Sequence, residues 1–555
     1  MKKNIYIFCT FLLLVILPIQ AQKNHNYEVG KNLDIFNKLY KTLDEYYVDT
    51  LQPEKLIPEA IQYMLDGLDP YTEYIPTNDA RNLQALTTGK YAGIGAIIHY
   101  YKDSDRCSVY ELYEEMPAAK AGVRAGDIIL SIDGKDVGKK GSNSVENYTS
   151  SISDQLKGDP GTSFVLEVKR LGISKPLKFT LHRTNIVIPA VPYITMVTND
   201  IGYIKLTTFT SGCSDQVRKA VKELKEQGAK NIVLDLRDNG GGLAIEAVDI
   251  VNIFVPKGKL ILSMKGKYQA SNLKYFSRNQ PEDINIPLVV LVNGKSASSS
   301  EITCGTLQDL DRAVILGERT YGKGLVQQTQ ELPYGAVLKL TTSHYYIPSG
   351  RCIQALDYSR LSSNGEAYRT PDSLTHVFHT AAGREVHDGG GITPDIKSVA
   401  DTLPDLIYYL LLNDRFMDYC TQYRNNHDTI APAAEFSITD SDYQKFKTYL
   451  EKSNFSYDRQ SYKALQELKK IAKSEGYGDT TVAEFTALEK KLSHNLGYDL
   501  DQWKAPIIKE LNAEIASRYY YKKGYYASLL KDDNFLRSAI RLLHHPNEYN
   551  RTLHQ

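Results

Sequence analysis

Small polar residues occupy the segment Lys295–Ser300 (Lys-Ser-Ala-Ser-Ser-Ser), between a predicted strand and a predicted helix. The preceding run Ile286–Val292 is apolar and β-branched, which favours a buried strand, and apolar residues recur at helical spacing from Glu301 onward. A serine in such a turn can lie exposed beside free backbone N–H groups, an arrangement suited to nucleophilic attack. Serines are also common helix caps, and this segment alone favours capping.

Lys323, between Gly322 and Gly324, is a candidate base for such a serine. A serine hydroxyl is a weak nucleophile, and a neutral lysine can activate it when the surroundings lower the lysine pKa. Unperturbed lysine titrates near ~10.4, so action near neutral pH requires a decrease of roughly 3 units, or about 4 kcal/mol. The flanking glycines would allow the close packing that buries the amine. Gln327, in the predicted strand Leu325–Glu331, lies four residues after Lys323, hence on the same face of an extended strand, and its neutral amide could orient the amine.

A glycine-rich loop, Arg237–Gly242 (Arg-Asp-Asn-Gly-Gly-Gly), follows a second predicted buried strand, Ile232–Leu236. A helix is predicted from about Leu243. A glycine triplet after a strand could hold a phosphate group. No Lys-Ser/Thr pair follows it, so it is not a Walker loop and no nucleotide is expected.

Two stretches around these residues, 296–302 (SASSSEI) and 307–327 (LQDLDRAVILGERTYGKGLVQ), closely resemble the carboxy-terminal processing, or tail-specific, proteases. These are serine–lysine peptidases. The resemblance implies that Ser298 is the nucleophile, that Lys323 is the base and that Gln327 supports it.

The same resemblance implies an oxyanion hole made by two backbone N–H groups, those of Gly241 and Ser299. One such donor typically contributes ~3 kcal/mol to transition-state stabilisation. It also implies a ClpP/crotonase-like α/β core that needs no metal or other cofactor.

The segments 93–98 (GIGAII), 117–123 (PAAKAGV) and 125–134 (AGDIILSIDG) resemble a PDZ domain. In such a domain, converging N–H groups of a glycine turn bind a carboxylate, and the following strand edge pairs with an extended peptide. The alternative is a plain β-hairpin with a tight turn. The residues expected to bind the peptide end are Gly93, Ile94, Gly95 and Ala96.

Arg170 ends the predicted strand VLEVKR of this domain. We predict that it reports peptide occupancy to the protease core, as the PDZ domain does in relatives. A solvated charge at a strand end is the alternative.

The chain of 555 residues is too long for one hydrophobic core. We expect an α/β multi-domain protein with a PDZ domain inserted ahead of the protease core. The expected parts are a signal peptide (1–21), an N-terminal helical region (22–90), the PDZ domain (91–184), the serine protease core (185–400) and a C-terminal helical domain (401–555). In relatives the N-terminal helices pack on another subunit, which implies a homodimer. The segment 510–524 (ELNAEIASRYYYKKG) resembles tails of Bacteroides-group members and carries no evident chemistry.

Met1-Lys2-Lys3 and the apolar run Ile5–Ile19 have the layout of a cleavable signal peptide, with cleavage after Ala21. The run is too short to predict a membrane span. Cys9 lies inside it, so no lipid-modified cysteine is expected. These features predict a periplasmic protein, and the net charge of zero argues against a nucleic-acid partner.

The five cysteines after the signal peptide are scattered, and they predict neither a disulfide framework nor a zinc site. Cys304 should lie in the core, two turns into its helix. His376, His379 and His387 fall in a stretch, Asp357–Gly390, that is predicted to be loop-like. No Glu lies between them and no helix is indicated, so no metal is expected.

These observations predict an exported serine endopeptidase that recognises apolar C-termini of protein substrates. One alternative is a non-catalytic PDZ-type binding protein for exported C-termini. The presence of Ser298, Lys323 and Gln327 together argues against it. A crotonase-type acyl-CoA enzyme would share the core fold, but it leaves the signal peptide and PDZ domain unexplained.

Overall fold

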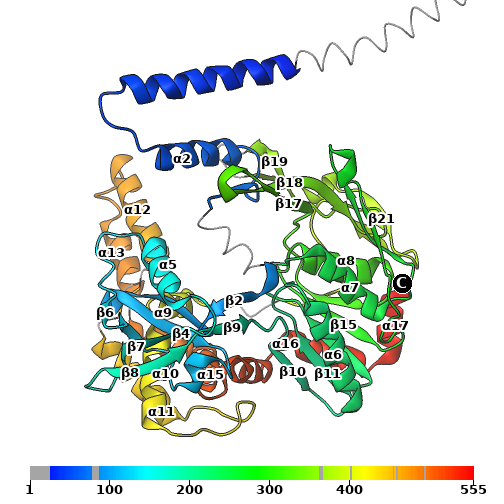
Figure 1. The fold of residues 1–555 in the computed structure, drawn as a ribbon. Coiled ribbons are helices and arrows are strands. Elements are labelled where there is room, and N and C mark those ends of the chain that lie inside the picture. The colour runs from blue at the N-terminus through cyan, green and yellow to red at the C-terminus, as the bar shows by residue number, and fades with distance from the viewer. Residues whose placement is uncertain are drawn as a thin grey trace, which may run out of the picture. The chain divides into compact units, whose positions relative to one another are not determined.

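The computed structural model describes residues 25–77, 87–361, 367–399, 403–453, 455–457, 460–492 and 495–554 (Figure 1). The predicted signal peptide, residues 1–21, lies outside the described residues. Contacts divide the chain into two compact units. One unit comprises Met1–Thr77 with Thr329–Leu340, and the other comprises Asn78–Gln328 with Thr341–Gln555.

The described residues of the smaller unit include two helices and a short strand. Residues 25–46 are helical, and α2 (Pro53–Asp66) follows after a short break, as the apolar spacing predicts. β1 (Glu73–Ile75) pairs antiparallel with β18 (Val337–Tyr346). The apolar side chains of the first helix are exposed, among them Leu33, Phe36 and Leu39. An apolar helix face therefore lies on the surface of this unit.

A six-stranded antiparallel sheet builds the PDZ domain, and its strand order is β3-β4-β5-β7-β8, with β6 pairing β5. β3 (Ala96–Tyr101) forms one end of that order. The helix α5 (Val145–Leu156) packs Tyr148, Ile152 and Leu156 into the core of this sheet, because their i, i+4, i+8 spacing puts them on one face. The remaining strands and the short helix α4 are β2 (Lys90–Gly93), β4 (Arg106–Leu112), α4 (Pro117–Lys120), β5 (Ile128–Ile132), β6 (Lys135–Asp136), β7 (Ser163–Lys169), β8 (Leu177–His182) and β9 (Thr184–Val187).

The protease core is built on a six-stranded sheet of order β10-β11-β12-β15-β16-β23. Only β10 pairs antiparallel, with β11; the other neighbours are parallel. Buried on both faces, the central strands consist almost wholly of apolar residues, as parallel strands usually do. The bounds are β10 (Tyr193–Met196), β11 (Ile201–Lys205), β12 (Asn231–Asp235), β15 (Leu288–Val292), β16 (Val314–Gly317) and β23 (Ile396–Lys397).

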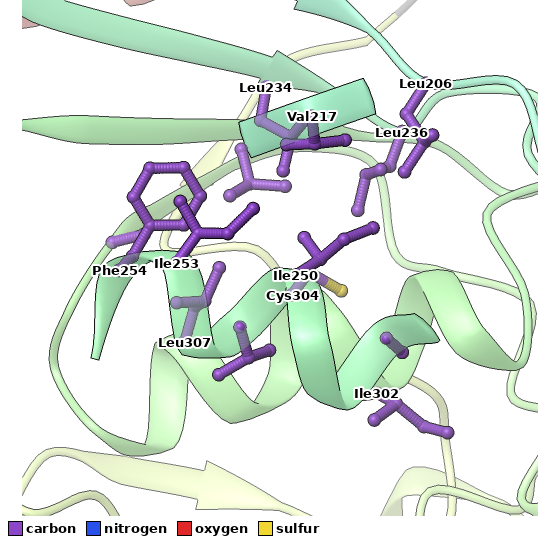
Figure 2. Packing of buried hydrophobic residues seen from close by; sticks show 14 of the residues in the cluster. Leu206, Val217, Leu234, Leu236, Ile250, Ile253, Phe254, Ile302, Cys304 and Leu307 are labelled. Atoms are coloured by element: carbon purple, nitrogen blue, oxygen red, sulfur yellow. The ribbon is translucent and has the colours of Figure 1, made fainter. Parts of the chain in front are cut away.

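Helices α6 (Cys213–Glu226), α7 (Ala244–Phe254) and α8 (Ser299–Asp309) pack on one face of this sheet. Figure 2 shows Ile250 and Phe254 of α7 lying against Cys304 and Leu307 of α8. Cys304 is fully buried, which confirms its predicted core position.

The other face of the sheet is covered by the last two helices of the chain, α16 (Asn534–Leu543) and α17 (Pro546–His554). Phe535 and Leu542 of α16 share a hydrophobic cluster with Val233 of β12 and Leu291 of β15. Neighbouring residues along these two strands point to the opposite face, where they pack against α7 and α8. The tail of the chain therefore completes the hydrophobic core around the central sheet.

The rest of the C-terminal region forms a separate helical cluster built mainly from α9, α10, α11, α14 and α15. Phe416, Phe446 and Leu511 lie at its centre. The bounds are α9 (Asp405–Leu412), α10 (Arg415–Asn426), α11 (Asp440–Lys452), α12 (Gln460–Ser474), α13 (Val482–Lys491), α14 (Leu496–Gln502) and α15 (Lys504–Leu530).

A second sheet of the core contains β13 (Leu260–Lys265), β14 (Lys274–Phe276), β17 (Leu325–Glu331) and β18. The prediction that Asp357–Gly390 is loop-like is wrong. Two hairpins lie there, β19 (Leu356–Leu361) with β20 (Ala367–Arg369), and β21 (Val377–His379) with β22 (Glu385–His387). Strands of three residues carry too few alternations to be recognised by period, and only their pairing defines them.

Among the described helices, none is both long enough and apolar enough to span a bilayer.

Candidate active site

Ser298 lies at the head of α8, a few residues beyond the end of β15. Its backbone has φ 54° and ψ −114°, a positive φ that is uncommon outside glycine. Such a strained turn from strand to helix projects a side chain away from the sheet, as at the nucleophile of α/β-hydrolases. Ser296, Ser299 and Ser300 are fully buried, whereas Ser298 is partly exposed. Ser298 is therefore the one serine of the run that a substrate could reach.

The three buried serines join the turn to the glycine-rich loop. Ser296 Oγ donates to Leu236 O, Ser299 Oγ to Gly242 O and Ser300 Oγ to Asn239 O, each at 2.8 Å. Capping alone thus does not account for the serine run, because these hydroxyls fix the two loops against each other.

Gly241 lies directly against the candidate nucleophile, at φ 100°. A Cβ there would lie 2.8 Å from Ser298 Cβ and 2.9 Å from Ser299 N, so only glycine fits. The Gly241 N–H donates to Asn239 Oδ1 at 2.9 Å. The Ser299 N–H, in the first turn of α8, has no acceptor among the described residues. Both predicted oxyanion donors therefore lie next to Ser298. The Ser299 N–H is open, and the Gly241 N–H is hydrogen-bonded to the Asn239 side chain.

Glu301, which the sequence analysis gave no role, connects the serine turn to the lysine segment. Its Oε2 accepts the backbone N–H groups of both Ser298 and Lys323, each at 2.9 Å. Its Oε1 accepts the Gly322 N–H at 2.7 Å and the Thr320 hydroxyl at 2.5 Å. One carboxylate thus brings the two candidate catalytic residues together through their backbones.

Burial raises the pKa of the fully buried Glu301 to about 7, although its four hydrogen bonds lower it. Thr320 Oγ1 also accepts the Ile392 N–H, and its second lone pair could accept a hydrogen bond from the protonated form of Glu301. The spacing Ser298-x-x-Glu301 is that of a capping box, the signal by which sequence reasoning could have found this residue.

Lys323 is half-buried in the loop before β17, and the glycines around it pack closely, as predicted. A Cβ on Gly322 would lie 2.4 Å from Ala355 Cβ, and one on Gly324 would lie 2.7 Å from Gln354 N. β17 begins at Leu325, as predicted, and Lys323 lies just before it, so a shared face of Lys323 and Gln327 stays a prediction.

Gln327 is half-buried on β17, and its Nε2 donates to Thr341 Oγ1 at 3.0 Å. This hydrogen bond fixes the amide of Gln327 against the neighbouring strand β18. The structure thus gives Gln327 a defined orientation through Thr341.

The PDZ loop is tightly folded around Gly95, at φ 74°, where a Cβ would lie 2.3 Å from Met116 Cβ. The carbonyls of Ile94 and Gly95 accept N–H groups from Ala118 and Tyr113, at 2.9 and 3.0 Å. The Ile94 side chain is buried in the domain core. Gly93, at the end of β2, and Ala96, at the start of β3, flank this turn.

Arg170 is buried within the PDZ domain, so the alternative of a solvated charge at a strand end is wrong, and its reporting role stays a prediction. Its Nε and Nη2 donate to the two carboxylate oxygens of Asp127, each at 2.7 Å, and Nη2 also donates to Gly122 O at 2.9 Å. The side chain is only 9% exposed, because the C-terminal helices cover this strand end.

The three histidines considered as metal ligands belong to the β21–β22 hairpin. His376 Nδ1 lies 3.1 Å from Asp388 Oδ2, and His387 Nδ1 lies 3.4 Å from Thr375 Oγ1. His379 pairs with Glu385 across the hairpin. No set of three or more metal-ligating residues is grouped in the described part of the chain.

Comparison with known proteins assigns three segments of the chain. Residues 200–358 match peptidase family S41, residues 108–170 match the PDZ domain, and residues 406–543 match the "Probable PDZ-protease, C-terminal helical domain". The fold and these matches together define a PDZ-containing protease.

Similar proteins show which class of PDZ-containing protease this is. A carboxy-terminal-processing protease of Bartonella bacilliformis is 34% identical over 64% of this chain and 81% of its own. The carboxy-terminal processing protease CtpA of Bacillus subtilis is 30% identical over 62% and 74%. The chain belongs to the carboxy-terminal processing proteases of peptidase family S41, which confirms the family predicted from its motifs.

Among solved structures, the photosystem II D1 C-terminal processing protease aligns with 66% of this chain and 93% of its own, at 28% identity and a TM-score of 0.36. The likeness of the tail to Bacteroides-group members stays a prediction.

Proposed function

We propose that this protein is an exported serine endopeptidase that binds apolar C-termini of protein substrates and cleaves by a Ser298–Lys323 mechanism. The main support is the convergence of the Ser298 and Lys323 N–H groups on one oxygen of Glu301. The contact of Gly241 with Ser298 adds to it.

In the proposed reaction, the neutral Lys323 amine takes the hydroxyl proton as Ser298 Oγ attacks the peptide carbonyl carbon. The oxyanion is stabilised by the Ser299 N–H and by the Gly241 N–H, once that group leaves Asn239 Oδ1. The Lys323 ammonium then gives its proton to the leaving nitrogen, and an ester to Ser298 remains. Lys323 next removes a proton from water, which attacks the ester carbon. As the bond to Ser298 Oγ breaks, Lys323 returns this proton to Oγ, and the new carboxyl end is released. Gln327 orients the amine and transfers no proton.

The turn Gly93-Ile94-Gly95-Ala96 would bind the substrate's α-carboxylate, and the free edge of β3 would pair with the residues before it. A cavity of about 1360 Å³ reaches from the PDZ domain to the glycine-rich loop and supports passage of the chain toward that loop, although Ser298 itself is not part of its lining. Its lining includes Met116, which contacts Gly95, and Asp238, from the loop that carries Gly241. Arg170 remains the proposed reporter of peptide occupancy.

We also propose cleavage of a signal peptide, residues 1–21, a periplasmic location and assembly as a homodimer. The exposed apolar face of helix 25–46 supports dimerisation, because such a face is usually covered in an assembly. The domain boundaries at 90, 184 and 400 belong to the same proposal.

The substrate end provides the test of this function. Peptides with one cleavage site and a varied terminus should differ in kcat/KM, with Ala, Val or Leu at the free end preferred. Amidating the terminus, or ending it in Asp, should lower kcat/KM by about tenfold to a hundredfold, because a charge-assisted hydrogen bond is lost. Equal cleavage of amide and free acid would remove the claim that the PDZ domain reads C-termini. Binding of the free acid without any cleavage would favour a non-catalytic binding protein.

A further inference from the structure

A cavity of about 270 Å³ lies between the PDZ domain and the C-terminal helices, within the larger unit. The PDZ domain contributes Arg124 and Arg170 to its wall, α10 contributes Arg424, and α15 contributes Arg518 and Lys522. Neither the active site nor the peptide-binding turn lines this cavity.

The cavity has an excess of positive charge. Arg170 is neutralised by Asp127, Lys522 by Glu111 at 2.8 Å and Arg518 by Glu514 at 3.1 Å. Arg124 and Arg424 have no carboxylate within ion-pair distance in the described ranges. Two guanidinium charges therefore remain without a counter-charge at contact distance.

The positive charges in this cavity affect the pKa of Arg124. Burial is the largest cause that lowers this pKa, and the positive charges of Arg170 and Arg424 lower it further. The negative charges of Asp127 and Asp428 raise it, but by less than the other causes lower it. Like charges are thus held close together in a partly desolvated place, which costs free energy unless an anion joins them.

Arg518 supplies an independent observation. Its side chain is 6% exposed, and its Nε and Nη2 atoms are buried with no acceptor in the part of the chain that the structure describes. The remaining nitrogen, Nη1, donates to Ser517 Oγ at 2.9 Å. Buried guanidinium N–H groups are expected to have acceptors, so Arg518 has two donors that a ligand in the cavity it lines would satisfy once the side chain turns toward it.

We propose that this cavity binds a small molecule through a phosphate group, with Arg518 donating to its oxygens and Arg124 and Arg424 balancing its charge. A phosphate monoester carries a charge of about −1.5 to −2 near neutral pH, which matches the two uncompensated guanidinium groups. Guanidinium and phosphate also match in geometry. Because Arg124 and Arg170 belong to the PDZ domain and Arg424 and Arg518 to the helices, the ligand would join these two parts.

The test titrates the full-length protein with inorganic phosphate, and separately with glycerol phosphate, at constant ionic strength set by KCl. Saturable heat by calorimetry and a rise in Tm are expected for at least one of the two ligands. Their relative affinities distinguish a free ion from a phosphate ester as the source. Arg124→Gln and Arg518→Gln should each weaken binding roughly tenfold or more. Arg360→Gln, at an exposed site on β19, is the matched control and should bind as the wild type does.

Arg124→Gln provides a second readout. Without phosphate it should keep or raise the Tm, because it removes a half-buried charge that has no ion-pair partner among the residues that the structure describes, and so it remains informative if Arg518→Gln does not fold. The proposal is overturned if neither ligand gives a saturable effect beyond KCl. Unchanged affinity in Arg124→Gln would also overturn it.

Discussion

At the residue scale, the carboxylate of Glu301 fixes the backbones of the proposed nucleophile and base. It accepts the N–H groups of Ser298, Gly322 and Lys323 together with the Thr320 hydroxyl. An isosteric amide has only one acceptor atom, so it must turn an NH₂ group toward at least one of these N–H donors.

We therefore expect Glu301→Gln to lower kcat/KM at least about tenfold, since one unsatisfied buried donor costs ~1–3 kcal/mol. The measurement is steady-state cleavage of a tail-bearing peptide, with circular dichroism as a check of folding. The control is Glu331→Gln, at an exposed position, which should leave kcat/KM unchanged. Gln308→Glu would not serve as a control, because the Gln308 side chain is also buried. Wild-type kinetics in a folded Glu301→Gln protein would contradict a positioning role.

At the element scale, the loop Arg237–Gly242 is linked to the last helices of the chain. The Arg237 guanidinium donates to both carboxylate oxygens of Asp533, at 3.1 and 2.7 Å. Asp533 is also the N-cap of α16, accepting the Leu536 N–H at 3.0 Å. One side chain thus caps a helix and fixes the loop that carries Gly241.

Two substitutions separate these roles. Asp533→Asn keeps a good N-cap and loses the charge, whereas Asp533→Ala loses both. Both should lower kcat/KM through the loop, and the alanine variant should unfold at lower urea concentration, by about 1 kcal/mol more. Equal stability of the two variants would show that the cap contributes nothing. Unchanged kcat/KM in both would show that Arg237 does not position the loop.

The sequence predicted the elements that a local pattern defines. The apolar strands β12 and β15 and helix α8 agree with prediction to within a few residues, and the serine and lysine motifs lead directly to Ser298 and Lys323. Contacts between distant segments were not predictable. The cover of the sheet by α16 and α17, the bond of Gly241 to Asn239 and the burial of Arg170 all depend on how elements pack, which no local period encodes.

At the scale of the whole molecule, buried carboxyl groups couple folding to pH. Burial is the main cause that raises the pKa values of Glu301, Asp414 and Glu510 to about 7. The folded protein therefore keeps protons that the unfolded chain has already lost above its ordinary carboxyl pKa. Burial lowers the pKa of His99 to about 4 and also lowers that of His344. These two histidines change the free energy of unfolding in the opposite direction, but only below about pH 6.5, where the unfolded chain begins to protonate them.

The free energy of unfolding should accordingly fall as pH rises from about 6 to 7 and level off by about pH 8, because near pH 6 the folded state still binds protons that the unfolded chain has already released. Each proton contributes on the order of 1.4 kcal/mol per pH unit over its window. Urea unfolding at several pH values measures the slope. Glu510→Gln, outside the active site, should make the fall in the free energy of unfolding with pH smaller, by the contribution of one proton. A stability that stays constant or rises across this range would contradict the assignment.

The most direct test of the central claim is labelling of the intact protein with a fluorophosphonate, followed by peptide mass spectrometry. The account predicts one adduct on Ser298, none on the buried Ser299 or Ser300, and no labelling of Ser298→Ala. Lys323→Arg should label far more slowly, since arginine does not deprotonate in proteins and cannot act as the base. An unlabelled wild-type protein that still cleaves peptides, or labelling at the wild-type rate in Lys323→Arg, would contradict the Ser298–Lys323 mechanism.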